Sequence, residues 1–121
     1  MSKVTAGSAL HELLYGAIRK RVLVKFRYQN KERIVEPHDY GVQKGITRLL
    51  SWQVGGQSSG QIPGWRWFDV SDIQACEMLE TSFAGNRDVS GNHHQWDEVF
   101  IRVEPPPTKI EKTDWKRTDG R

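Results

Sequence analysis

The hydrophobic pattern changes period near residue 21, and this change limits the possible folds more than any other feature. Before it, apolar residues recur every three or four positions, which is the pattern of one buried stripe on a helix. They are Leu10, Leu13, Leu14, Ala17 and Ile18. After it, apolar residues alternate with more polar ones, which predicts a half-buried β-strand. These are Val22, Val24, Phe26 and Tyr28. The chain must therefore place a helix directly before a strand.

The helix has recognisable end signals. Ser8 stands just before the apolar stripe, so we expect it to be the N-cap, with residues 1–9 forming an N-terminal arm. Arg19, Lys20 and Arg21 follow the stripe, where positive charge favours the C-terminal end of the helix dipole.

Further short alternating segments follow, separated by turn signals such as Lys44-Gly45 and the glycine-rich residues 55–64. With the first, the predicted strands are residues 22–28, 32–36, 46–54, 65–70 and 73–79. Residues 38–43 could continue the second strand, and periodicity alone leaves a helix open for residues 73–80. Pro37 lacks a backbone N–H, so the second strand should lie at an edge or bend there. We expect a mainly β chain with an N-terminal helix, arranged as a small five-stranded barrel.

Composition sets the domain organisation. The 121 residues suffice for one core, and the aliphatic content is concentrated in residues 10–83. Residues 84–107 are polar with a candidate extra strand at 99–103, and residues 108–121 carry alternating charge typical of disorder. Cys76 is the single cysteine, which excludes an internal disulfide. Because Cys76 lies in an apolar segment, we expect it to be an unreactive core residue. With no apolar run of membrane-spanning length and no signal peptide, we expect a cytoplasmic protein with no membrane partner.

A series of motifs then resembles the WYL domain family over residues 10–83. A helical Ala17-Ile18 segment precedes a strand ending in Tyr28, and an Arg-x-Val-x-Pro motif begins at Arg33. An Arg-x-Phe pattern beginning at Arg66 leads to Ile73. The sequence departs from the family where Thr47, Arg48 and Leu49 replace the name-giving Trp-Tyr-Leu.

The resemblance implies an Sm-like, SH3-like barrel and a regulatory module that recognises a nucleic acid or nucleotide-like anion without catalysis. Arginine offers a planar fork of donors that suits phosphate, and an adjacent aromatic ring can stack on a base. The candidate ligand-binding residues are Tyr28, Arg33, Arg48, Trp52 and Arg66. The net charge of +3 permits an anionic partner but does not require one.

Arg48 has a structural alternative. Strand alternation places it on the same face as Ile46, Leu50 and Trp52, an apolar set where a charge must be paired or functional. It could instead lie over Trp52 or pair with a carboxylate such as Glu36 or Asp69. Tyr28 and Trp52 could equally be core residues.

A second hypothesis is an interaction module. Trp65 and Trp67 share one strand face while Phe68 lies on the other, so one of these faces should point outward or contact a protein partner or a second copy. Cover by the helix or by the C-terminal tail is the equal alternative. We expect neither cofactor nor metal, because the adjacent His93 and His94 lack the spacing of a structural metal site. We also find no acid–base pair that would indicate an enzyme.

Overall fold

The computed structural model describes residues 2–87 and 95–106. Its elements in chain order are α1 (Ser2–Lys20), β1 (Val22–Tyr28), β2 (Lys31–Gln43), β3 (Ile46–Gly56), β4 (Gly64–Asp69), a 3₁₀ turn (Val70–Asp72), β5 (Gln74–Ser82) and β6 (Glu98–Arg102). The predicted mainly β chain with one N-terminal helix is confirmed. Residues 74–80 lie in strand β5 and not in a helix, and the candidate strand near 99–103 is β6.

The predicted start of the helix is wrong. Helix α1 begins at Ser2, so Ser8 is an interior position and most of residues 1–9 are helical rather than an arm. Serine is only mildly unfavourable inside a helix, so a serine before an apolar stripe does not have to begin one. The predicted stripe is correct, since Leu14, Ala17 and Ile18 are fully buried against the sheet.

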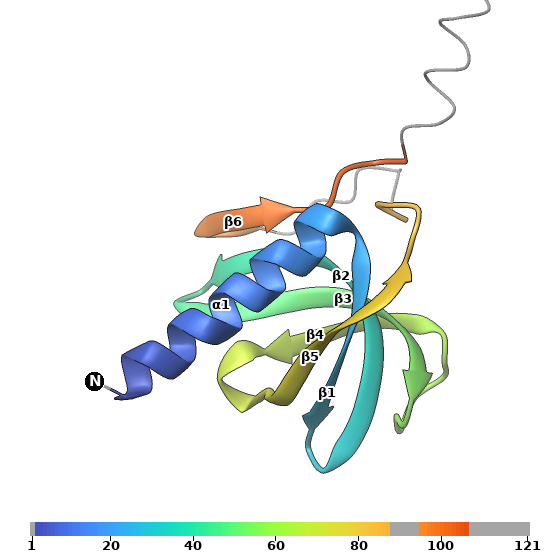
Figure 1. Cartoon of the computed structure of the whole chain (residues 1–121), viewed down its shortest axis with the longest axis horizontal. Coiled ribbons are helices and arrows are strands. Elements are labelled where there is room, and N and C mark those ends of the chain that lie inside the picture. The colour runs from blue at the N-terminus through green and yellow to red at the C-terminus, as the bar shows by residue number, and fades with distance from the viewer. Residues whose placement is uncertain (1, 88–94, 107–121) are drawn as a thin grey trace, which may run out of the picture.

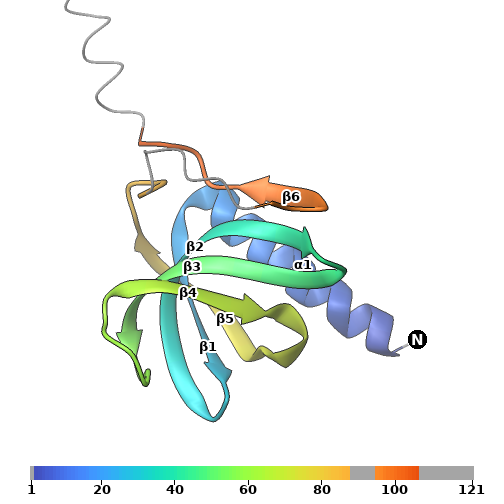
Figure 2. The same ribbon diagram turned by 180° about the vertical axis from the view of Figure 1, so that it is seen from behind.

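The strands form one antiparallel sheet of six, in the order β4-β3-β2-β1-β5, with β6 added to β2. Strand β3 runs along one edge of β2, so β1 and β6 must share the other edge. Strand β1 pairs with Lys31 to Val35, and β6 pairs with Asp39 to Val42. Figure 1 shows the sheet curling beneath α1, with β6 beside the helix, and Figure 2 shows the same strands from behind.

The expectation of a five-stranded barrel is wrong because the sheet does not close. Within the described residues β4 and β5, which end the strand order, do not pair with each other, whereas the sixth strand, β6, is the extra strand that the sequence indicated. Closure requires hydrogen bonding between the terminal strands. Here β5 turns back along β1 instead, and the sheet stays open.

Pro37 marks the point where β2 exchanges partners. The pairing of β2 with β1 ends at Val35 and the pairing with β6 begins at Asp39, while the register with β3 shifts between Pro37 and Asp39. The missing N–H is tolerated at this irregularity. Strand β2 is therefore central and not an edge strand. Of the two alternatives predicted for Pro37, an edge position or a bend, the bend is correct.

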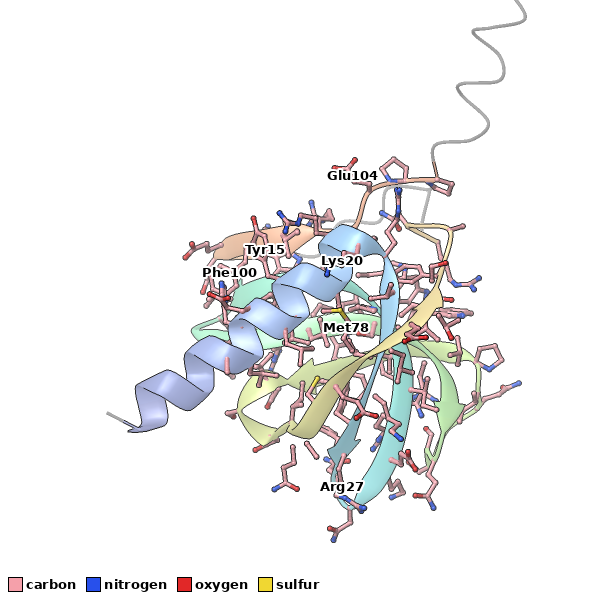
Figure 3. The ribbon with its side chains drawn as sticks, in the orientation of Figure 1. Tyr15, Lys20, Arg27, Met78, Phe100 and Glu104 are labelled. Carbon is pink, nitrogen blue, oxygen red and sulfur yellow. The ribbon has the colours of Figure 1, made fainter. Side chains whose placement is uncertain are left out.

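The core lies between the inner face of the sheet and α1. It is built around Phe26, Val35, Leu49, Phe68 and the helix stripe. Figure 3 shows Met78 lying beneath α1, and Arg27 at the opposite end of the molecule, near the turn between β1 and β2. Val103, which follows β6, is also buried in this core, so the packed unit extends beyond Phe83.

Candidate anion-binding site

Strand register divides the predicted site residues between two faces of the sheet. Arg66 lies opposite Ser51 and Phe68 lies opposite Leu49, on the buried inner face. Trp65 lies opposite Trp52 on the outer face. Tyr28, Arg33 and Arg66 therefore share the inner side, whereas Arg48 and Trp52 belong to the outer side. The five predicted ligand-binding residues do not form one cluster.

Within the described residues, Arg33 is a buried cation held only by neutral acceptors. Arg33 is 6% exposed, and its guanidinium carbon lies 5.6 Å from the ring centroids of both Tyr28 and Phe68. Nη1 donates to Gln53 Oε1 at 3.3 Å, and Nη2 donates to the Tyr28 carbonyl at 3.4 Å and to Gln29 Oε1 at 3.5 Å. These distances are long for hydrogen bonds. The guanidinium is therefore weakly satisfied.

The electrostatics of Arg33 favour an anion. In the described part of the chain no carboxylate lies within ion-pair distance of it, and its Nε is buried without a hydrogen-bond partner. Burial lowers the pKa of Arg33, and the positive charge of Arg66 lowers it further. Burying an unpaired charge beside a like charge is costly, and an anion would offset that cost.

Tyr28 is a core residue that also forms one wall of this site. Its ring packs edge-to-face on Phe68 at 4.8 Å, and its hydroxyl accepts a hydrogen bond from the Asp69 backbone N–H at 3.0 Å. The fold thus uses the hydroxyl oxygen as an acceptor. Tyr28 can contribute its ring face to Arg33 or to a ligand beside it.

Arg66 holds the glycine-rich segment before β4. Nη2 donates to the Gln61 carbonyl at 2.7 Å and to Ser58 Oγ at 3.0 Å, and Nη1 donates to the Trp65 carbonyl at 2.8 Å. A Cβ at Gly60 would lie 3.0 Å from Nη2 of Arg66, so a larger residue there would require this side chain to shift. Arg66 is partly exposed, whereas Arg33 is buried.

Two buried polar residues of the inner face escaped the sequence analysis. Ser51 is fully buried, and its Oγ has no partner among the described residues. Gln53 is also fully buried and links Arg33 to the carbonyls of Gly55 and Gln57. Their alternation with Leu50, Trp52 and Val54 was visible, but it did not show that the more polar face points inward.

Arg48 pairs with a carboxylate, as the structural alternative expected. Its Nε donates to Asp69 Oδ1 at 3.0 Å, and its Nη1 donates to Gln43 Oε1 at 3.0 Å. Asp69 is its cross-strand neighbour, so this pair joins β3 to β4. The contacts explain how a charge is accommodated beside Leu50 and Trp52.

The outer face carries an aromatic cluster. Trp52 and Trp65 pack at 5.2 Å, and Trp65 also meets His38 edge-on at 4.9 Å. Trp65 and Trp67 are 37% and 38% exposed, while Phe68 is buried, so the predicted division between the two faces is confirmed. Trp67 contacts Trp96 at 5.7 Å, which brings the segment before β6 onto this face.

The described residues contain no group of three or more His, Cys, Asp or Glu side chains that could hold a metal ion. His93 and His94 lie outside them. Helix α1, the one α-helix among these residues, is not apolar enough to cross a membrane.

Comparisons with known proteins reveal a similarity of fold. The chain resembles the structure of proteasome accessory factor B/C (PafBC) of Arthrobacter aurescens, with a TM-score of 0.55 and 21% identity. The match covers 65% of this chain but only 13% of that one, and at this identity it bears on the fold alone. No family model matches the sequence. No curated protein matches it either.

Proposed function

We propose that this chain is a WYL-like regulatory module that binds a nucleic acid or nucleotide-like anion in the cytoplasm, without catalysis. The observation that carries the proposal is the buried Arg33 guanidinium, which has only neutral acceptors among the described residues and lies near a second cation, Arg66. A phosphate group between the two would supply the negative charge that the described residues do not.

The fold is compatible with this proposal. A helix precedes five antiparallel strands that curl into an open sheet, and β6 extends it. Helix α1 covers one end of the sheet, whereas the β1–β2 turn lies at the other (Figure 1). The likeness of fold to PafBC is also compatible with a WYL-like relationship.

The proposal assigns different roles to the predicted residues. Arg33 and Arg66 bind the anion, and the Tyr28 ring packs beside Arg33. Ser51 Oγ, which has no partner in the described part of the chain, is a further donor for a ligand that enters the inner face. Arg48 serves the fold through Asp69. Trp52 lies on the other face and takes no part in anion binding.

The test is a titration of the full chain at low salt with inorganic phosphate, adenosine monophosphate and a single-stranded DNA oligonucleotide. Binding should raise the melting temperature and weaken as salt increases. Arg33→Met and Arg66→Ala should lose the effect. Arg19→Ala removes the same charge from an exposed position near the end of α1 and serves as the matched control. If none of the three probes binds the wild-type chain, the proposal is wrong.

The second candidate is a protein-interaction module, favoured by the exposed Trp65 and Trp67 on the outer face. Sedimentation of the ligand-free chain at several concentrations distinguishes the two. A stable dimer that Trp67→Ser abolishes would favour the second function. A monomer with salt-sensitive anion binding would favour the first.

A further inference from the structure

The outer face of β2 carries a buried carboxylate that needs a cation. The Glu36 side chain is 6% exposed, and Glu36 lies opposite Trp52 in the β2–β3 register. A carboxylate removed from water is stable only when it is paired or neutralised. Glu36 therefore creates a strong local demand for a positively charged group.

Arg87 meets this demand with the geometry of specific guanidinium recognition. Its Nε lies 2.6 Å from Glu36 Oε1 and its Nη2 lies 2.9 Å from Oε2, a two-point ion pair. Its guanidinium carbon lies 5.1 Å from the centroid of the Trp52 ring. A carboxylate facing the two N–H groups of a guanidinium, together with an aromatic ring against the guanidinium plane, selects arginine over lysine.

The two sides of this contact differ in secondary structure. Glu36 and Trp52 lie on adjacent paired strands, whereas Arg87 follows β5 in a segment without regular structure. The Arg87 side chain is 47% exposed, so it can leave without disrupting the core. A preformed receptor is thus filled by an exposed side chain of an irregular segment.

We propose that Glu36 and Trp52 form an arginine-binding site that Arg87 fills in cis and that an arginine of a partner protein fills in trans. The chain's own Arg87 shows which chemistry the site accepts. Trp65, which packs on Trp52, and the neighbouring Trp67 offer exposed apolar surface for residues flanking the incoming arginine. The site lies on the face opposite Arg33 and does not depend on anion binding.

Competition between the two arginines sets the expected affinity. A side chain tethered nearby acts at an effective concentration of about millimolar. A single arginine in trans must overcome this advantage, so an isolated peptide binds the wild-type chain weakly. Removing Arg87 while keeping Glu36 should strengthen peptide binding at least tenfold.

The experiment uses a short blocked peptide with a central arginine and a matched peptide in which neutral citrulline replaces it. Tryptophan fluorescence reports binding to the wild-type chain, Arg87→Gln and Glu36→Gln. We expect Arg87→Gln to bind the arginine peptide at least tenfold more tightly than wild type and to ignore the citrulline peptide. Glu36→Gln should bind neither. Equal binding of both peptides to Arg87→Gln would overturn the proposal.

A second measurement on the unmodified chain covers the case in which Arg87→Gln does not fold. In NMR spectra of the wild-type chain, the arginine peptide should shift the Arg87 Nε–H signal as Arg87 leaves Glu36. The citrulline peptide should leave it unchanged. If the Arg87 Nε–H chemical shift stays unchanged at arginine-peptide concentrations well above millimolar, the contact between Arg87 and Glu36 is only structural. Arg33→Met should retain the shift, which separates this result from the anion test.

Discussion

His38 Nε2 accepts a hydrogen bond from the Arg87 backbone N–H at 3.2 Å, while its Nδ1 lies 2.9 Å from the Glu36 carbonyl oxygen. A carbonyl oxygen can only accept, so Nδ1 carries the proton and the imidazole is neutral. The residue is 2% exposed. Protonation would therefore both bury a charge and break the contact with Arg87.

We predict that His38 makes folding pH-dependent. Burial lowers the pKa of His38 below 6.5, outweighing the raising effects of the Glu36 carbonyl and of the Glu36 and Asp39 carboxylates; Arg87 lowers it as well. The unfolded chain then binds the proton first as pH falls. The stabilisation is complete above about pH 6.5 and is lost as pH falls through the folded pKa, by at most about 1.4 kcal/mol per pH unit.

Urea unfolding at a series of pH values measures this effect. His38→Gln, which can still donate and accept hydrogen bonds, should flatten the dependence between pH 7 and 5. If the wild-type and His38→Gln curves stay parallel over that range, His38 is not the group responsible.

We predict that Arg33→Met weakens anion binding but does not destabilise the chain. Methionine has a similar shape and removes a buried charge that no carboxylate in the described part of the chain compensates. Replacing such groups with apolar ones is often neutral or stabilising, here by about 1 kcal/mol. Thermal unfolding in phosphate-free buffer provides the measurement. A large loss of stability would mean that the neutral contacts of Arg33 are essential to the fold.

Gly41→Ala should detach β6 from β2. A Cβ at Gly41 would collide with the backbone carbonyl of Glu98 and come within 2.9 Å of the Val99 Cα. We expect a destabilisation of about 1–3 kcal/mol, measured by chemical unfolding. Gly55→Ala is the matched control, since its Cβ would make only ordinary contacts with Ile34 at 3.5 Å. Equal effects of the two substitutions would contradict this explanation.

The Arg48–Asp69 ion pair should contribute little to stability. Its side chains are 28% and 40% exposed, so water screens the pair. A double-mutant cycle with Arg48→Ala and Asp69→Ala should give a coupling of about 0–1 kcal/mol. Anion binding by Arg48→Ala should match that of the wild type. A clear loss of binding would return Arg48 to the ligand site.

Cys76 should react slowly with iodoacetamide. Burial, with a smaller contribution from Glu77, raises the pKa of its thiol to about 12, so almost no thiolate exists at pH 8. We expect labelling of the native chain to be at least a hundredfold slower than labelling of the urea-unfolded chain. Comparable rates in the two states would show that the segment opens readily.

Much of the fold could be predicted because local patterns report local structure. The change of period near residue 21 correctly predicted a helix followed by a strand, and turn signals such as Lys44-Gly45 correctly divided the strands. The start of the helix could not be predicted, since residues 2–7 contain no strong helix breaker that would separate an arm from the helix. The addition of β6 to β2 depends on contacts distant in sequence, and these leave no local pattern.

The candidate site shows the same division. Alternation correctly placed Trp65 and Trp67 on one face of β4 and Arg66 with Phe68 on the other. In β3, alternation grouped Arg48 with Trp52, but it could not show that this face points outward while Ser51 and Gln53 point inward. That depends on which strands and helix cover each face.

The sequence by itself determined the helix–strand order, most strand positions and which side chains share a face, because these follow from backbone periodicity. Only the tertiary structure decided which face became the interior, since burial depends on how β2, β3 and α1 pack. That choice placed Arg33 near Arg66 and, in the part of the chain that the structure describes, left Arg33 with neutral contacts alone. It also gave Arg48 and Glu36 partners of opposite charge on the outer face.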